Sequence, residues 1–176
     1  IGGVHRGVEY SFDISQDLIA LANIPMIVIS AGAKAVLDIP KTLEMMETMG
    51  ISVLGYQTMI FPAFYSRESG AGKICSVNSP NEVVEIYNNS VAAGLKSSVF
   101  VANPIPEQSE IPNNEIESII TTACSDARNK KISGKETTPF LLKQIVKNTG
   151  GRSLEANKAL ALNNVKLGVK IVRQFS

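Results

Sequence analysis

The amino-acid sequence predicts an α/β fold, a layered α/β/α arrangement around a largely parallel sheet. Short apolar runs alternate with amphipathic stretches along the 176 residues, which is the order of strands and helices in α/β proteins. Several of these runs are apolar and often β-branched on both alternating faces, as buried parallel strands are. The chain is also 44% hydrophobic and 19% charged, which suits a packed core and argues against disorder.

The predicted strands are short apolar runs, each followed by a turn or a polar segment. They are Met26–Ser30, Ile51–Gly55, Lys73–Val77 and Ser98–Ala102. The segment Asn103–Pro112 is too rich in proline for a regular element. It follows a predicted strand, at the end where α/β folds tend to place ligand-binding loops.

The predicted helices are recognised by their start and stop signals. If the segment after Ser15 is helical, Ser15 caps it. After Lys34 we expect a short turn and then a helix over about Lys41–Met49, because Pro40 disfavours helical geometry at Ile39. The later signals are a capping box at Ser79–Glu82 with a stop at Gly94, a cap at Asn113 or Asn114 for a helix to about Lys130, a start at Thr138–Pro139 with a stop at Gly150–Gly151, and a cap at Ser153.

Composition excludes several classes of function. The formal net charge is +1, so there is no global electrostatic case for a nucleic-acid or membrane-surface partner. No apolar run approaches the roughly 20 residues that span a bilayer, and no secretory signal is evident. Cys75 and Cys124 are far apart and form no disulfide framework, so we expect a reducing cytoplasm.

Lys34 is a candidate nucleophile because it lies just beyond a predicted strand, where open α/β sheets bind ligands. In the first turn of a helix, the helix dipole would favour its neutral amine, and partial burial by Ile29, Val36 and Leu37 would act in the same direction. A neutral lysine amine forms Schiff bases with carbonyl compounds. The alternative is a solvated turn lysine, and spacing alone does not decide between them.

The other candidates have structural alternatives too. Asp13 and Asp17 could hold a hard cation or bind sugar hydroxyls, or could serve only helix capping. His5 and Arg6, in a glycine-rich turn, suit a phosphate or a polar substrate, although a lone histidine is more often structural. Asn157 could point into a site from the start of the last helix, or be an ordinary surface residue.

Eight segments, taken in order, resemble the pseudouridine-5'-phosphate glycosidase family, which is also called indigoidine-synthase-A-like. The resemblance covers essentially the whole chain, and its segments are "GGVHRG", "FDISQDL", "SAGAKAVLDI", "TLEMMETMGISVLGYQT", "FPAFYSRES", "VANPIPEQ", "GKETTPFLL" and "TGGRSLEAN". It implies reversible cleavage of the C–C glycosidic bond of pseudouridine 5'-phosphate to uracil and ribose 5-phosphate.

The resemblance also implies site residues. Lys34 matches the family's nucleophile, which forms an imine at C1' of the ribose, and Asp13 matches a contact to a divalent metal, typically manganese. Ser15, Gln16 and Asp17 match substrate contacts. Asn157 matches a polar residue of the active site, and His5 lies close to that site by the same matching.

The chain begins inside the family's pattern, so residues 1–176 are interpreted as the C-terminal part of a single glycosidase domain. The resemblance places a proton-donating glutamate and a phosphate-binding lysine in an N-terminal portion, and implies a homotrimer. The fold is therefore expected to be incomplete without that portion, which a separate N-terminal fragment could supply. Two alternatives stay open: a Schiff-base aldolase or lyase acting on another sugar phosphate, and a non-catalytic fragment.

Overall fold

The computed structural model describes residues 1–132 and 136–175, so the first two residues of the segment "GKETTPFLL" lie outside the described part. The strands are β1 (Ile27–Ser30), β2 (Ser52–Tyr56), β3 (Cys75–Val77) and β4 (Val99–Ala102). The helices are α1 (Val8–Ser11), α2 (Gln16–Asn23), α3 (Ile39–Thr48), α4 (Pro80–Ala92), η1 (Glu107–Ser109, a 3₁₀ turn), α5 (Asn113–Asn129), α6 (Thr137–Asn148) and α7 (Arg152–Val172).

In the described residues the sheet has four strands in the order β1-β4-β2-β3, and every pair is parallel. The central strand β4 is buried along its whole length, and its Phe100 lies in register with Val28 of β1 and Val53 of β2. All four predicted strands are present within two residues of their expected bounds. The prediction of a largely parallel sheet is therefore confirmed.

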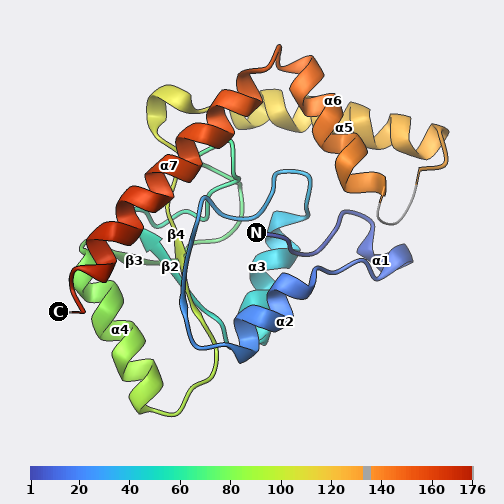
Figure 1. Ribbon diagram of the computed structural model, residues 1–176. Helices are drawn as coiled ribbons and strands as arrows, with labels where there is room; N and C mark the ends of the chain where they lie inside the picture. The colour runs from blue at the N-terminus through green and yellow to red at the C-terminus, as the bar shows by residue number, and fades with distance from the viewer. Residues whose placement is uncertain (133–135, 176) are drawn as a thin grey trace.

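The alternation of side chains along the strands separates two apolar layers. Val99 and Val101 of β4 pack toward α4 and α7, together with Leu167 and Ile171. Phe100 lies on the opposite face, in the cluster that includes residues of α2 and α3. Figure 1 shows α4 and α7 on one side of the sheet and α2 and α3 on the other, with α5 and α6 packed together beyond its end. The layered α/β/α arrangement is thus confirmed.

Two predicted helix starts are present as expected. The Ser15 hydroxyl accepts a hydrogen bond from the Asp17 N–H at 3.2 Å, which caps α2. The Ser79 hydroxyl accepts one from the Glu82 N–H at 3.3 Å, and the Glu82 carboxylate reaches back to the Asn78 N–H at 3.1 Å. In both helix starts the capping residues lie within a few positions of one another, so the sequence alone reveals them.

Other helix starts differ from the prediction. Helix α3 begins at Ile39 rather than Lys41, because Pro40 occupies the first turn, where a backbone N–H has no intrahelical partner to lose. Helix α5 begins at Asn113 after Pro112, without a side-chain cap. Helix α6 begins at Thr137, one residue early.

The predicted cap at Ser153 is also wrong. Gly151 precedes the first residue of α7 in the left-handed conformation, with φ 84°. Ser153 therefore lies inside the first turn of α7, where it is buried and within 3.1 Å of the Thr149 hydroxyl. The turn is set by the glycine, whose conformational freedom a serine lacks.

The turn after β1 depends on a close backbone approach. Gly32 has φ 88°, and a Cβ at this position would lie 2.0 Å from the carbonyl oxygen of Pro62. Gly32 also pairs with Ala63 across an antiparallel bridge. Only glycine satisfies both the left-handed conformation and the contact, so this residue fixes the path of the chain into Lys34.

No helix in residues 1–132 or 136–175 is both long and apolar enough to cross a membrane.

We expect Gly32→Ala to lower the free energy of unfolding by more than about 3 kcal/mol, because the methyl group meets the Pro62 carbonyl in a strained conformation. Gly50→Ala is the matched control: Gly50 also has positive φ, 69°, but no atom lies within 4 Å of the position that its methyl group would take. It should lose only about 1 kcal/mol. Equal losses in urea denaturation would contradict the role of the Pro62 contact.

Asp38→Ala should lower the free energy of unfolding by about 1 kcal/mol, because the Asp38 carboxylate caps α3 by accepting from the Lys41 N–H at 3.1 Å. Asp38→Asn should lose less, since an amide oxygen can still accept. Burial alone would raise the Asp38 pKa, but hydrogen bonds from Lys41 outweigh it and lower the pKa. The wild-type advantage over Asp38→Asn is therefore present above the ordinary carboxyl pKa and is lost as pH falls through the lowered value. Equal urea midpoints of the wild type and Asp38→Ala at neutral pH would refute the capping role of Asp38.

Candidate active site

The first five residues, Ile1–His5, lie between two loops that carry predicted site residues. On one side Val4 pairs with Ile14 in the loop before α2, and on the other His5 pairs with Leu37 in the loop after β1. Both bridges are antiparallel. This segment therefore joins the loop of Asp13 and Ser15 to the loop of Lys34.

Two glycines make this arrangement possible. A Cβ on Gly2 would lie 2.3 Å from the Ser15 hydroxyl oxygen, and a Cβ on Gly3 would lie 2.5 Å from that of Thr42. Contacts this short do not occur between a real Cβ and its neighbours. The paired glycines of the "GGVHRG" segment therefore allow the backbone to approach α2 and α3 closely.

The residues around the start of α2 are held against the same segment. The Asp17 carboxylate accepts a hydrogen bond from the Gly2 N–H at 2.6 Å, in addition to its place in the first turn. Gln16 is the first residue of α2 and is exposed, and Ser15 is half-buried. The capping role expected of Ser15 is thus confirmed, and Asp17 also fixes the glycine segment.

Lys34 lies in the loop between β1 and α3, not in a helix. The condition for an effect of the helix dipole is therefore not met. Its N–H donates to the Ile1 carbonyl at 3.0 Å. Lys34 is half-buried between the fully buried Ala33 and Ala35. The assignment of Lys34 as a nucleophile rather than a solvated turn lysine therefore stays a prediction.

Lys34 and Asn157 line one cavity of about 180 Å³. Lys34 enters it from the loop after β1, and Asn157 enters it from the second turn of α7. The other lining residues are Ala35, Val36, Phe64, Tyr65, Leu142, Val146, Ser153 and Leu154. A mainly apolar wall with a few polar groups is typical of small-molecule sites. The structure thus brings together two candidates that lie 123 positions apart in the sequence (157 − 34).

Two aromatic residues of this cavity were not predicted as site residues. Phe64 has φ 63°, which is unusual for a bulky side chain, and its N–H donates to the Ala31 carbonyl at 2.9 Å. Tyr65 packs edge-on against Phe64, and burial raises the pKa of its phenol, so the hydroxyl stays neutral. The segment "FPAFYSRES" marks both in the sequence, but no local pattern assigns them to the cavity.

His5 and Asp13 are neighbours, with 3.7 Å between His5 Nδ1 and an Asp13 carboxylate oxygen. Among the described residues, no three His, Cys, Asp or Glu side chains form a metal-binding group. Among the described residues, a cation at Asp13 would therefore have that carboxylate as its acidic ligand. Its other ligands would mainly be water molecules. Hard cations such as Mg²⁺ accept that kind of coordination.

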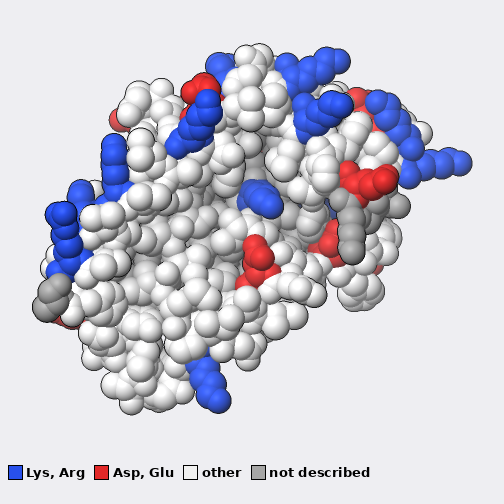
Figure 2. Space-filling view, in the orientation of Figure 1, with Lys and Arg blue, Asp and Glu red and all other residues white. Residues whose placement is uncertain are grey.

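Arg6 does not fit the expected phosphate contact. Its guanidinium makes a bidentate pair with Glu117 of α5 and donates to two backbone carbonyls. Figure 2 shows both basic and acidic side chains on the visible face, mostly toward its rim, and a large uncharged area between them. This face offers no broad basic surface for nucleic acid.

Comparison with known proteins places the chain in one family. The family model described as "Indigoidine synthase A like protein" matches residues 1–174. The pseudouridine-5'-phosphate glycosidase of Methylobacterium nodulans is 48% identical over 97% of this chain and 51% of its own length. The enzyme of the same name from Petrotoga mobilis is 46% identical over 100% of this chain and 58% of its own. The chain therefore spans about half the length of the curated relatives it matches.

Solved structures agree with the sequence comparison. The indigoidine synthase A-like protein of Thermotoga maritima superposes with a TM-score of 0.86 at 40% identity, over 97% of this chain and 55% of that protein. The prealnumycin C-glycosynthase in complex with ribulose 5-phosphate gives a TM-score of 0.94 at 29% identity, over 99% and 57%. The chain belongs to the indigoidine-synthase-A-like family, as the family match, the sequence identities and the shared fold together show.

Proposed function

We propose that this chain carries the nucleophile of an enzyme that reversibly cleaves pseudouridine 5'-phosphate into uracil and ribose 5-phosphate. The observation that carries the proposal is the cavity in which half-buried Lys34 faces a mainly apolar wall together with Asn157. Relatives at 45–50% identity bear the name of this glycosidase. A further relative that forms C-glycosides binds ribulose 5-phosphate. Both support a pentose phosphate substrate.

A C–C glycosidic bond has no leaving oxygen or nitrogen to protonate, so hydrolysis by paired carboxylates suits it poorly. A lysine amine offers another route. The Lys34 nitrogen bonds to C1' as the ribose ring oxygen is released and takes a proton. The nitrogen lone pair then forms the C1'=N double bond while the bond to the base breaks. The base carbon keeps the electron pair and accepts a proton, and water hydrolyses the imine to give ribose 5-phosphate and free lysine.

The remaining candidates would bind and orient the substrate. Asn157 supplies an amide within the same cavity as Lys34, where it can donate to and accept from a uracil edge or a hydroxyl. Ser15, Gln16 and Asp17 lie at the start of α2, where the half-buried Ser15 and the exposed Gln16 and Asp17 are proposed to bind sugar hydroxyls. His5 lies between that helix start and the Lys34 loop. These roles follow from position and from the family resemblance.

Asp13 is proposed as the protein ligand of a divalent cation, with manganese as the expected metal. A half-buried carboxylate beside His5 fits a cation that keeps most of its water. When bound, such a cation stabilises negative charge that develops on oxygen. In this chain Asp13 would hold the ion, while its backbone carbonyl accepts from the His5 N–H at 3.0 Å.

Two further parts of the proposal rest on the family resemblance alone. A proton-donating glutamate and a phosphate-binding lysine belong to the portion of the relatives that this chain does not span, so that portion is a proposed partner. A homotrimeric assembly is proposed on the same basis, whereas a cytoplasmic setting is proposed because Cys75 and Cys124 form no disulfide framework.

Two other functions are separable by experiment. A Schiff-base aldolase acting on another sugar phosphate would condense other aldehydes as well as ribose 5-phosphate. A non-catalytic fragment would form no imine, and mixing it with the N-terminal portion of a relative would leave it without activity. Condensation of uracil with ribose 5-phosphate in that mixture, but not with other aldehydes, favours the glycosidase.

We expect borohydride reduction in the presence of ribose 5-phosphate to trap a stable adduct on Lys34. Because Lys34 lines a cavity and Lys73 is an exposed lysine of a surface loop, Lys34→Ala should abolish the adduct and Lys73→Ala should leave it unchanged. Mass mapping of the labelled peptide provides the measurement. An adduct on another lysine, or an unchanged yield in Lys34→Ala, would refute the nucleophile assignment.

For the metal, Asp13→Asn should weaken Mn²⁺ binding at least about tenfold, since it removes the charged oxygen ligand. Asp17→Asn is the comparison, because Asp17 lies four residues away and already holds the Gly2 N–H. Electron paramagnetic resonance of free Mn²⁺ gives the affinity without any turnover. Loss of Mn²⁺ affinity in Asp17→Asn alone would assign the metal to the Asp17 carboxylate instead. Absence of Mn²⁺ binding by the wild type would exclude the site.

A further inference from the structure

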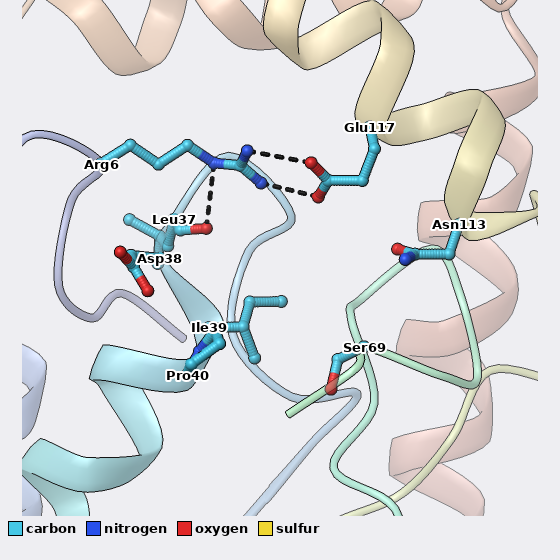
Figure 3. Close-up of a pocket in the computed structure, with 8 residues that line it drawn as sticks. All are labelled: Arg6, Leu37, Asp38, Ile39, Pro40, Ser69, Asn113 and Glu117. Carbon is cyan, nitrogen blue, oxygen red and sulfur yellow. Dashed lines mark hydrogen bonds and ion pairs between the residues drawn. The ribbon is translucent and has the colours of Figure 1, made fainter. Parts of the chain in front are cut away.

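The Arg6 guanidinium makes four hydrogen bonds to neighbouring protein groups. Its Nε donates to the Leu37 carbonyl at 3.2 Å, and one terminal nitrogen donates to the Ala35 carbonyl at 3.1 Å. The two terminal nitrogens also bind the two carboxylate oxygens of Glu117, at 2.9 and 2.7 Å. Figure 3 shows the guanidinium between the Leu37 carbonyl and the Glu117 carboxylate. The acceptors of these bonds are two backbone carbonyls and one carboxylate.

The two carbonyls belong to the loop that presents Lys34. Ala35 and Leu37 are the first and third residues after Lys34, and both are fully buried. Buried backbone carbonyls require partners, and Arg6 supplies one to each. On the other side, the Asp38 N–H donates to the Val4 carbonyl at 2.9 Å. The loop after Lys34 is thus held by Arg6 and by the segment that contains Arg6.

Glu117 determines how Arg6 lies. The bidentate pair fixes the plane of the guanidinium, which a single contact would leave free to rotate. Burial alone would lower the Arg6 pKa, but the hydrogen bonds and charge of Glu117 outweigh it and raise the pKa. Arg6 therefore stays cationic. Through Glu117 and Arg6, α5 is connected to the loop that carries Lys34.

We propose that Arg6 is a positioning residue for Lys34, and that the Arg6–Glu117 pair links α5 to the loop that aims the amine. The functional part of this inference rests on the proposed Schiff-base activity; the structural part does not. Arg6, Asp38, Ser69, Asn113 and Glu117 also line a cavity of about 490 Å³. The alternative role is anion binding in that cavity, where the Arg6 guanidinium would be shared between the anion and its four protein contacts.

The chain offers a matched control on the same helix. Glu115 of α5 pairs with Arg152 of α7 through both of its carboxylate oxygens, two residues before Glu117. Arg152 donates to no carbonyl of the Lys34 loop; its backbone acceptor is the Thr149 carbonyl at 3.2 Å. Glu115→Gln and Glu117→Gln therefore remove the same charge from the same helix, and of the two pairs the Arg6–Glu117 pair bonds to the loop that carries Lys34.

The decisive measurement is hydrogen exchange in the peptide containing Ala35–Asp38, compared among wild type, Glu117→Gln, Arg6→Lys and Glu115→Gln. Glu117→Gln should speed exchange of the Leu37 and Asp38 amides about tenfold or more, and Glu115→Gln should leave it unchanged. Arg6→Lys keeps the charge but loses the fork, so it should behave like Glu117→Gln. Unchanged exchange in Glu117→Gln, or equal exchange in both glutamine variants, would overturn the proposal.

The rate of borohydride trapping on Lys34 connects the loop to its function. Glu117→Gln and Arg6→Lys should trap ribose 5-phosphate about tenfold more slowly than Glu115→Gln, because a displaced amine reacts more slowly. If the wild type traps nothing, the proposed Schiff-base activity fails, and the exchange result then tests only whether the Arg6–Glu117 pair holds the loop that carries Lys34. Faster exchange with an unchanged trapping rate would show a purely structural role and would overturn the positioning of Lys34. Inorganic phosphate that slows exchange in wild type but not in Arg6→Lys would instead indicate an anion site.

Discussion

The close approach of the Gly2–Gly3 backbone to the two helices beside it is the constraint on which the rest of the site depends. A methyl group on either glycine would overlap a hydroxyl of α2's cap or of α3. With hydrogen in place of methyl, the segment pairs with one loop through Val4 and with another through His5. Because these pairings are made by backbone atoms, they connect the Lys34 loop to the loop before α2 directly, and the side-chain bonds of Arg6 add to them.

The cavity that results has a mainly apolar wall, and its lining comes from several separate elements. Lys34 comes from a backbone-bonded loop, Asn157 from a helix of 21 residues, and Phe64 from a turn in a strained conformation. Chemistry by an amine requires both access to a carbonyl carbon and exclusion of competing water. In the proposed reaction Lys34 would supply the amine, and Leu142, Val146 and Leu154 would help to exclude water from the cavity that they line.

Sequence predicts those features that are encoded locally. The four strands and the caps at Ser15 and Ser79 depend on residues within a few positions, and the structure confirms them. Pro40 and Ser153 were misassigned because their effect depends on where the helix begins, which a neighbouring aspartate or glycine decides. The shared cavity of Lys34 and Asn157 could not be derived from spacing, since packing of α7 against the sheet brings them together. The pairing of Arg6 with Glu117 could not be predicted for the same reason, because Glu117 lies on a helix that is distant in the sequence.

That distance has a consequence for the order in which the molecule folds. Arg6 and Glu117 are separated by 111 positions, whereas the pairing of His5 with Leu37 closes a loop of only 32 (37 − 5). Loop closure costs more entropy as the loop lengthens, and distant contacts form only after the intervening chain has organised. The glycine segment can therefore pair with the Lys34 loop early, whereas the Arg6–Glu117 pair can form only after α5 has docked. If Arg6 positions Lys34 as proposed, the Lys34 loop reaches its final geometry late in folding, and a partly folded chain lacks the placement that the proposed reaction requires.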